Sequence, residues 1–527
     1  MFLDFDQPVD LPNQFDVCVV GAGPVGLAAA WALRRRNLKV LLLEAGGAGD
    51  EERCQSLFES EVQFLAQENL GVNSRFRVFG GNATRWGGQL VPLTDTDFQP
   101  RAATGQVGWP FGAEVLEPYQ RQVLDMVGIG SADFDIGCYA SRSREPLDLD
   151  ADVIITRLSK WLPWNRRNIG KFLQPAFARD ADITVLLHAN AVEILLDDSL
   201  QAVSGIRVRS YAGREQTVSA RSFILSAGPI ETSRLLLNSN RQVSAGIGNQ
   251  HDLVGRFFMD HTWLRAGTIV PTNRRAFMTG VRPFFIRNVM HSPRFELAKA
   301  VQEQQGCLAA YGLVRFEARQ GSALGELFAA LKQYQAGGTR ALMKGRYWRV
   351  LSELPDVAAA FFARTFLGLR PIPAKSTPVL YLSTEQPPRR ESRIALQDAQ
   401  DSLGLRKVTM QWSNGEQERA TMFLLARLFD EQLRKHNLAS VHWEQCDPHS
   451  NSSTRPIEDF FHHLGGARMS ASEGEGVVDP DCRVHGTRNL YVASCAVFPT
   501  GGSANPTFTA MALAFRLADN LAAQSRG

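Results

Sequence analysis

The chain lacks a strong excess of charge of either sign. Its 57 lysines and arginines face 54 aspartates and glutamates, which leaves a formal net charge of +3 over 527 residues. A protein that binds nucleic acid through its phosphates needs a larger or more concentrated positive charge. We therefore expect no nucleic-acid partner. The length of the chain allows two or more domains.

Long apolar runs are also missing. No stretch reaches the roughly 20 consecutive apolar residues that a membrane-spanning helix needs. Residues 1–13 are acidic and have neither the basic nor the apolar region of a signal peptide, so we expect a cytoplasmic location. Residues 332–370 carry seven basic residues against two acids, which fits either the solvated face of a cap helix or contact with a membrane surface.

Cysteine is sparse and scattered along the chain. The seven cysteines include no pair at the CxxC spacing of zinc sites and redox motifs, and their number is odd. We therefore expect neither a disulfide framework nor a metal site. Cys18 falls inside an apolar run, which suits a small buried side chain.

What the chain does have is a glycine-rich turn near its start. An apolar run leads into residues 21–26, Gly-Ala-Gly-Pro-Val-Gly, and a stretch rich in alanine and leucine separates this turn from a second apolar run at 39–43. This order is typical of the βαβ unit that binds a dinucleotide. Gly21 permits the tight turn, Gly23 lets the backbone approach the pyrophosphate, and Gly26 lets helix and strand pack closely.

An acidic residue, Glu44, directly follows the second apolar run. At this position a carboxylate binds the ribose hydroxyls of the adenosine half of the cofactor. The same carboxylate repels a 2′-phosphate, so NADP is disfavoured. NAD and FAD both remain open on this feature alone.

Further along, strand and helix patterns continue the α/β character. Residues 183–226 contain apolar and β-branched stretches between turn residues, which predicts a β meander. Its last stretch runs through Ala227 and Gly228 into a helix pattern. A strand at 489–493 followed by a helix at 506–521 repeats this order, as a doubly wound domain requires.

The middle of the chain differs from both ends. Residues 262–455 carry no further nucleotide motif, and residues 297–369 alternate apolar and basic positions at helical spacing. Strand patterns occur at 378–384, 391–396 and 406–413. We interpret the middle as a substrate domain with a layer of strands and a helical cap.

These patterns together predict an α/β protein with two domains. A Rossmann-like nucleotide-binding domain is assembled discontinuously from residues 1–95, 180–261 and 456–527. An α+β substrate domain, with an antiparallel sheet and a helical cap, takes residues 96–179 and 262–455.

The C-terminal part holds the candidate catalytic residues. His462 and Asn505 each lie in a turn rich in glycine or proline. A neutral imidazole can accept a proton near neutral pH. An amide can hold the oxygen that loses this proton.

Four separated segments together resemble the glucose–methanol–choline oxidoreductases, flavoenzymes that bind FAD. The segments are residues 21–26 with Glu44, residues 80–88, residues 226–236, and residues 462–469 with Asn505 and Pro506. They follow the family's order across nearly the whole chain. The run at 496–502 is closer to bacterial sugar and alcohol dehydrogenases and to pyranose oxidases than to the fungal glucose oxidases.

The resemblance implies a role for each residue of the C-terminal pair. His462 aligns with the catalytic base of the family, and His463 is the rival for this role. Asn505 takes the second catalytic position, where its amide orients the substrate hydroxyl and its backbone contacts the flavin. His261 either approaches the cavity or is an ordinary buried histidine.

The resemblance also implies which residues contact FAD. These are Gly21, Gly23, Pro24, Val25, Gly26, Glu44, Ala45, Gly80, Gly81, Asn82, Thr84, Arg85, Trp86, Gly87, Gly88, Val192, Ala227, Gly228, Ser494, Cys495, Asn505, Pro506 and Thr507. Some relatives link FAD covalently to a histidine in the glycine-rich loop, where this chain has Arg85. A guanidinium stays protonated and cannot form that bond, so we expect non-covalent FAD.

The implied reaction is oxidation of a CH–OH group to a carbonyl, on a sugar, glycoside or related polyol. The hydride goes to flavin N5 while His462 takes the proton, and the electrons then pass to oxygen or a quinone-type acceptor. A non-sugar alcohol and a redox-neutral lyase of the same fold remain alternatives. A third alternative, a binding protein that keeps FAD only for folding, is disfavoured because both His462 and Asn505 are present.

Overall fold

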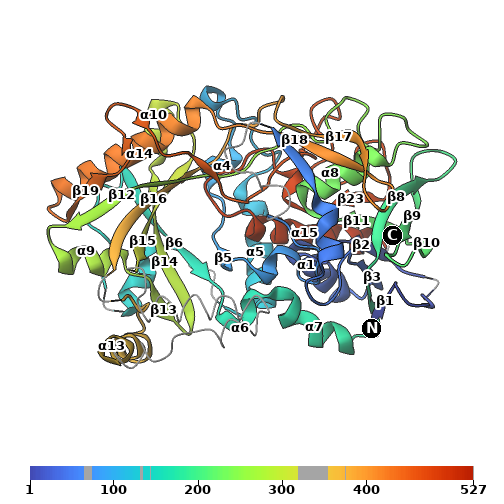
Figure 1. Cartoon of the computed structure of the whole chain (residues 1–527), viewed down its shortest axis with the longest axis horizontal. Helices are drawn as coiled ribbons and strands as arrows, with labels where there is room; N and C mark the ends of the chain where they lie inside the picture. The colour runs from blue at the N-terminus through green and yellow to red at the C-terminus, as the bar shows by residue number, and fades with distance from the viewer. Residues whose placement is uncertain are drawn as a thin grey trace.

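The computed structural model describes residues 1–12, 14–63, 74–130, 134–142, 144–318, 354–373 and 376–525. Two large sheets lie side by side (Figure 1). A parallel sheet with its helices occupies the half that holds both chain termini, and an antiparallel sheet occupies the other half. The architecture is α/β with a separate antiparallel layer, as the sequence predicts.

The parallel sheet forms from short runs of apolar residues. Two of its central strands consist of four buried apolar residues each, a pattern typical of strands covered on both faces. All neighbouring strands in this sheet are parallel. The order is β1 (Phe2–Asp4), β7 (Ile183–Leu187), β3 (Val40–Leu43), β2 (Val17–Val20), β11 (Ser222–Leu225) and β23 (Leu490–Val492).

Helices cover the parallel sheet and bury its apolar side chains. One group packs together: α1 (Pro24–Arg34), α5 (Glu117–Met126), α7 (Ile169–Arg179) and α15 (Thr507–Gln524). α1 begins at Pro24, where a proline's fixed backbone and missing N–H cost nothing. α8 (Gly228–Asn238) follows β11, as the sequence predicts for the helix after Gly228.

The predicted meander at 183–226 is wrong in its outer strands. β7 and β11 belong to the parallel sheet, whereas the strands between them form a separate antiparallel sheet. That sheet contains β8 (Asn190–Leu196), β9 (Val203–Arg209) and β10 (Glu215–Val218). The error arises because an apolar strand pattern does not reveal its partner, and β7 pairs with strands from the beginning of the chain.

Nine strands build the antiparallel sheet of the second half. Its main path is β19 (Ala439–Trp443), β12 (Thr262–Pro271), β16 (Thr377–Thr384), β15 (Ala310–Glu317), β14 (Val289–Leu297), β6 (Ile154–Trp161) and β5 (Gln89–Leu90), with β13 (Phe284–Ile286) on β14 and β22 (Glu458–Asp459) on β12. The helical spacing read at 297–369 is wrong for β15, a strand that is largely buried on both faces. Continuous burial removes the alternation that marks a strand.

An amphipathic helix covers this sheet. α14 (Glu416–Lys435) packs its apolar side against β14, β15, β16 and β19, and a second hydrophobic core fills the space between them. The other helices of this half are α9 (Arg274–Val281), α10 (Lys299–Gln305) and α13 (Leu354–Thr365). Of the basic region 332–370, residues 332–353 lie outside the described residues.

The remaining elements are short. A three-stranded sheet contains β17 (Arg393–Gln400), β18 (Arg406–Gln411) and β4 (Ser60–Gln63), and β20 (Cys446–Asp447) pairs with β21 (Ser452–Ser453). Single helical turns are α2 (Glu52–Gln55), α4 (Asp95–Phe98), α6 (Trp164–Arg167) and the 3₁₀ turns η1 (Ser56–Phe58), η2 (Gly81–Thr84), η3 (Ala102–Thr104), η4 (Ala113–Val115) and η7 (Cys495–Val497), and η5 (Ile136–Arg142) is a longer 3₁₀ segment. Within the described ranges, no helix is both long and apolar enough to cross a bilayer.

The division into two domains at the predicted boundaries stays a prediction. α5 and α7 lie in the segment 96–179 that it assigns to the substrate domain, yet both pack against α1 of the parallel half. All seven cysteines are free, and Cys18 is fully buried in β2.

Candidate active site

The glycine turn after β2 has a separate steric reason for each glycine. Gly21 has a φ of +101°, which favours glycine, and a Cβ on Gly26 would lie 1.9 Å from the carbonyl oxygen of Gly21. A Cβ on Gly23 would meet no atom of the protein within 4 Å. The turn is therefore closed at Gly26 and open at Gly23, where a cofactor's phosphates can approach the helix N-terminus.

Glu44 lies at the end of β3 with its carboxylate beside this turn. Its Oε2 accepts the N–H of Ala22 at 3.0 Å, and its Oε1 accepts the N–H of Gly46 at 2.8 Å. Burial raises the pKa of Glu44 to about 7, against the lowering effect of these two N–H groups. The carboxylate is held in a fixed orientation and keeps lone pairs for ribose hydroxyls.

One long cavity connects the glycine turn to the C-terminal candidate residues. It encloses about 1440 Å³ that protein atoms do not fill, part of it open to solvent. Many of the residues predicted to contact FAD line it: Gly21, Gly23, Pro24, Val25, Glu44, Ala45, Gly81, Asn82, Val192, Ala227, Gly228, Ser494, Cys495, Pro506 and Thr507. The open backbone at Gly23, the fixed acid and the elongated cavity fit an FAD molecule.

Several other predicted contact residues are not in the cavity lining. They are Gly26, Gly80, Thr84, Arg85, Trp86, Gly87, Gly88 and Asn505. A Cβ on Gly81 would lie 2.9 Å from the Cα of Gly23, so the glycine-rich loop packs on the phosphate turn. Arg85 pairs with Asp50 and covers the ring of Phe76 at 4.1 Å. The roles of these residues toward FAD stay predictions.

A buried network of charges that the sequence did not predict lies along the cavity wall. Glu231 is its centre: Arg75 Nη1 lies 2.7 Å from Oε1, Arg77 Nη2 lies 2.8 Å from Oε2, and Arg234 pairs with both Glu231 and Asp401. Burial alone would raise the pKa of Glu231, but the three guanidinium groups lower it to about 2. The spacing Arg-x-Arg just before the glycine-rich loop was the available signal, and it was not recognised.

His462 lines the C-terminal end of the cavity, and Asn505 lies directly beside it, outside the lining. Asn505 Nδ2 lies 3.1 Å from His462 Nε2, and the other ring nitrogen of His462, Nδ1, lies 2.9 Å from His261 Nδ1. His261 Nε2 in turn lies 2.7 Å from the carbonyl oxygen of Gly502. On the far side, Arg294 Nη1 donates to Asn505 Oδ1 at 3.3 Å.

Neighbouring backbone explains why the two histidines meet. The segment around His261 runs antiparallel to the segment around His462, through the bridge between Met259 and Leu464. Oδ1 of the fully buried Asp260 accepts the backbone N–H of both histidines, each at 2.7 Å. The same carboxylate therefore holds both segments in register.

Both imidazoles of this pair are neutral at physiological pH. Burial holds the pKa of His462 well below its usual range, and so does the repulsion that a positive His462 would meet from His261 and His463 in their charged forms and from Arg294. Burial lowers the pKa of His261 to about 4. A neutral His462 can accept a proton.

His463 has a different environment from His462. Its side chain is buried against Phe258, and burial lowers its pKa to about 3. Its Nε2 lies 3.8 Å from Asp260 Oδ2, and no group in the described part of the chain hydrogen-bonds to that nitrogen. The geometry joins His462, and not His463, to Asn505.

Backbone strain is localised next to His462. Phe461 has a φ of +58°, which a bulky side chain rarely adopts. Phe460 stacks on Trp263 with ring centroids 4.3 Å apart and meets the His462 ring edge-on. The strained turn allows one aromatic ring to pack inward while Phe461 lines the cavity.

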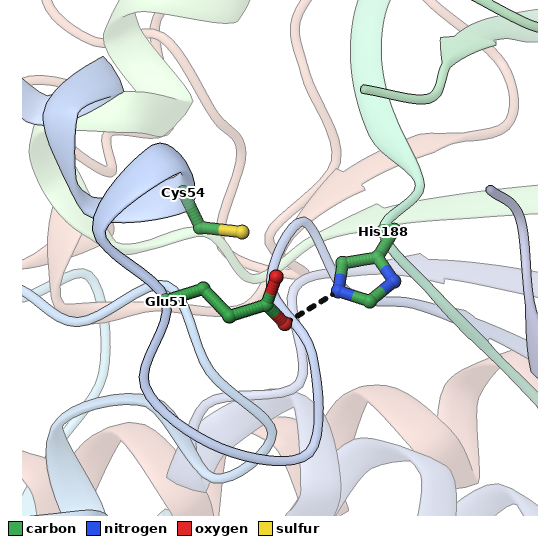
Figure 2. Close-up of side chains that lie close together, drawn as sticks. All are labelled: Glu51, Cys54 and His188. Carbon is green, nitrogen blue, oxygen red and sulfur yellow. Dashed lines mark hydrogen bonds and ion pairs between the residues drawn. The ribbon is translucent and has the colours of Figure 1, made fainter. Parts of the chain in front are cut away.

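A second cluster of titratable groups surrounds His188, after β7. The ligand-type atoms of Glu51, Cys54 and His188 lie within 4.8 Å of one another, and Asp4 and Asp6 form a second group with the same histidine. Figure 2 shows how the side chains of Glu51, Cys54 and His188 lie close together. Each ring nitrogen of His188 lies 2.7 Å from a carboxylate oxygen, Nδ1 from Asp4 and Nε2 from Glu51. A protonated imidazole donates to both, so the arrangement is explained as an ion-pair cluster.

Comparisons with known proteins agree with this geometry. Residues 167–263 and 388–514 match family models described as GMC oxidoreductase, and residues 16–70 match one described as FAD dependent oxidoreductase. The chain is 21% identical to a 2-methyl-1,2-propanediol dehydrogenase from Mycolicibacterium austroafricanum, over 96% of this chain and 95% of that protein. It is also 21% identical to a paromamine 6'-oxidase from Streptomyces fradiae, over 96% and 91% of the two chains. A solved pyridoxine 4-oxidase from Mesorbium loti has the same fold, with a TM-score of 0.59 and 15% identity over 96% of this chain and 99% of that one.

Proposed function

The chain belongs to the glucose–methanol–choline oxidoreductase family and is an FAD-dependent oxidoreductase, and on this basis we propose that it oxidises a secondary or primary CH–OH group of a sugar, glycoside or related polyol to a carbonyl. The observation that carries the proposal is the pair of His462 and Asn505: His462 lines one end of the cavity that fits FAD, and its Nε2 lies 3.1 Å from the Asn505 amide nitrogen.

The pair can handle the hydroxyl proton of such a substrate. In the neutral state, His462 has one unprotonated ring nitrogen that can accept a proton, and the Asn505 amide has N–H groups that can donate to the substrate oxygen. A hydroxyl that takes the place of the direct contact between His462 Nε2 and the Asn505 amide donates to the imidazole and accepts from the amide. Proton loss raises the electron density on oxygen and weakens the adjacent C–H bond. FAD, when bound, supplies the hydride acceptor at N5.

Arg294 supports the developing negative charge. Its guanidinium is fully buried, donates to Asn505 Oδ1 and pairs with Glu296 at 3.0 Å. A cation behind the amide polarises it, and a polarised amide N–H is a stronger donor to an oxygen that loses its proton.

The substrate class is supported by the names of two relatives. One is named for a diol and the other for paromamine, and both align over almost the whole of this chain. Both names denote compounds with more than one hydroxyl group. The electron acceptor that we propose is oxygen or a quinone-type compound.

The proposal is tested by an anaerobic substrate screen. Purified holoenzyme is mixed with sugars, glycosides and diols, and simple monohydric alcohols serve as the comparison series. We expect loss of the flavin's visible absorbance with at least one polyhydroxy compound and slower loss with the monohydric alcohols. The substrate class would be wrong if monohydric alcohols were faster, and the function would be wrong if no hydroxyl compound bleached the flavin.

A further inference from the structure

A continuous hydrogen-bond chain runs through the candidate catalytic pair. It joins the Gly502 carbonyl to His261 at 2.7 Å, His261 to His462 at 2.9 Å, His462 to Asn505 at 3.1 Å, and Asn505 to Arg294 at 3.3 Å. The two ends of this chain have opposite and fixed polarity. A carbonyl oxygen can only accept a hydrogen bond, and a guanidinium can only donate one.

The fixed end at Gly502 determines where the protons are. His261 Nε2 must carry a hydrogen to donate to the carbonyl, so Nδ1 of neutral His261 has only a lone pair. The hydrogen between the two rings then belongs to His462 Nδ1. Neutral His462 is left with an unprotonated Nε2.

The contacts at the Arg294 end of the hydrogen-bond chain assign the same tautomer to His462. Arg294 donates to Asn505 Oδ1, so the amide nitrogen of Asn505 faces His462 and donates to its Nε2. An accepting Nε2 has no hydrogen. The two assignments agree, although they start from opposite ends of the chain.

The group at the Gly502 end is itself held in place. The N–H of Gly502 donates to Glu385 Oε2 at 2.8 Å, and the buried Glu385 pairs with Arg101 at 2.7 Å. Gly502 has a φ of +57°, and a Cβ there would lie 2.5 Å from Leu93, so only glycine fits. The acceptor that fixes His261 therefore cannot turn away without disturbing a buried ion pair.

We propose that His261 is a positioning residue that holds His462 in the tautomer whose unprotonated Nε2 faces Asn505 and the incoming hydroxyl. The inference rests on the proposed function of His462 as the base. When His462 takes the substrate proton on Nε2, its Nδ1–H bond to His261 becomes charge-assisted and stabilises the imidazolium. The alternative is that His261 only fills space in the core.

Two variants of His261 separate these alternatives. His261→Gln keeps one donor for the Gly502 carbonyl and one acceptor for His462 Nδ1–H. His261→Leu keeps most of the volume and has neither. A residue that only packs would tolerate leucine at least as well as glutamine, whereas a positioning residue requires glutamine.

The direct readout is the ¹⁵N spectrum of histidine-labelled holoenzyme, with the His462 signals identified by their loss in His462→Ala. We expect wild type and His261→Gln to have hydrogen on Nδ1 and a bare Nε2. In His261→Leu only the 3.1 Å contact with Asn505 still favours this form, so we expect part of the His462 population to adopt the other tautomer. With the fastest substrate of the screen, we expect flavin reduction by His261→Leu to be slower by about 10- to 100-fold, with little change in substrate affinity and near-wild-type rates for His261→Gln.

The spectrum of wild type alone decides the proposal if His261→Leu fails to fold, since hydrogen on Nε2 of wild-type His462 would overturn it. So would an unchanged tautomer in His261→Leu, or a shifted tautomer without slower reduction. The spectrum needs no substrate. If it showed hydrogen on Nδ1 of His462 in an enzyme that oxidises no alcohol, the proposed function would be wrong and the tautomer assignment would still hold.

Discussion

At the scale of single residues, two glycines of the same turn have opposite steric surroundings. Gly23 has an ordinary negative φ and open space where a Cβ would lie, whereas a Cβ on Gly26 would collide with the Gly21 carbonyl. We expect Gly23→Ala to keep the stability of the FAD-free protein within about 0.5 kcal/mol but to weaken FAD binding at least tenfold. The reason is that the new methyl group points at the space for the pyrophosphate.

Gly26→Ala is the matched comparison, and we expect it to lower the melting temperature of the FAD-free protein as well. Calorimetry of both FAD-free variants and fluorescence titration with FAD provide the two measurements. Unchanged FAD affinity in Gly23→Ala would remove the turn from the cofactor site.

Sequence could identify the catalytic candidates but not the residues that hold them. His462 and Asn505 stand in a recognisable segment of the last 70 residues. Arg294 lies in β14, where no local pattern marks it, and His261, directly before β12, could be named only as a histidine that either approaches the cavity or is buried. Their roles depend on contacts between residues far apart in the chain, and such contacts are a property of tertiary packing.

At the scale of elements, the ion-pair cluster around His188 ties β1 to the turns after β3 and β7. Burial opposes a charge on His188, but its hydrogen bonds to Asp4 and Glu51 outweigh this effect and raise its pKa. A raised pKa means that the stabilisation is fully present below the ordinary value of about 6.5 and is lost as pH rises through the raised value. As pH falls through the lowered pKa values of Asp4 and Glu51, these carboxylates lose their charge and the stabilisation is lost on the acid side as well.

We therefore expect the cluster to stabilise the protein more at mildly acidic than at alkaline pH. His188→Asn is a suitable variant, because asparagine tolerates the φ of +55° at this position and cannot become charged. Its melting temperature should fall below that of wild type by roughly 1–3 °C near pH 6, with a smaller difference near pH 9. Calorimetry at both pH values gives the comparison, and a difference independent of pH would contradict a charged His188.

Strands could be predicted one at a time, but their pairing could not. The apolar runs at β2, β3, β16 and β18 are visible in the sequence because each is bounded by turn residues or a change of periodicity. β15 was not predicted as a strand, because burial on both faces removes its alternation of apolar and polar residues. The strands that pair with β7 and β11 were not predicted, because parallel neighbours lie far apart in the chain.

At the scale of the whole molecule, motifs from opposite ends of the chain come together in the half that holds the parallel sheet. The glycine turn and the C-terminal helix α15 meet because α1 and α15 pack together beside one sheet. The motif order predicted this meeting, and the matches to the family models confirm the fold. The antiparallel sheet was predicted only in outline, since its strands carry no motif of their own.

Whether FAD is attached covalently can be tested on the whole holoenzyme. Arg85 stands where some relatives carry the linking histidine, and in the structure it pairs with Asp50. We expect all FAD to be released when the holoenzyme is denatured with acid or heat. The measurement is the visible absorbance of the supernatant and of the washed precipitate. Yellow colour that stays with the polypeptide would show a covalent link through another residue.

The central claim is that His462 removes the substrate proton, and anaerobic stopped-flow reduction tests it most directly. Wild type, His462→Ala and His463→Ala are compared at equal FAD content with the fastest substrate of the screen. His462→Ala should reduce its flavin about 10²- to 10⁴-fold more slowly, the usual cost of losing a general base. His463→Ala should stay within about tenfold of wild type, because its ring makes no contact with Asn505. A slow His463→Ala beside a fast His462→Ala would contradict the account.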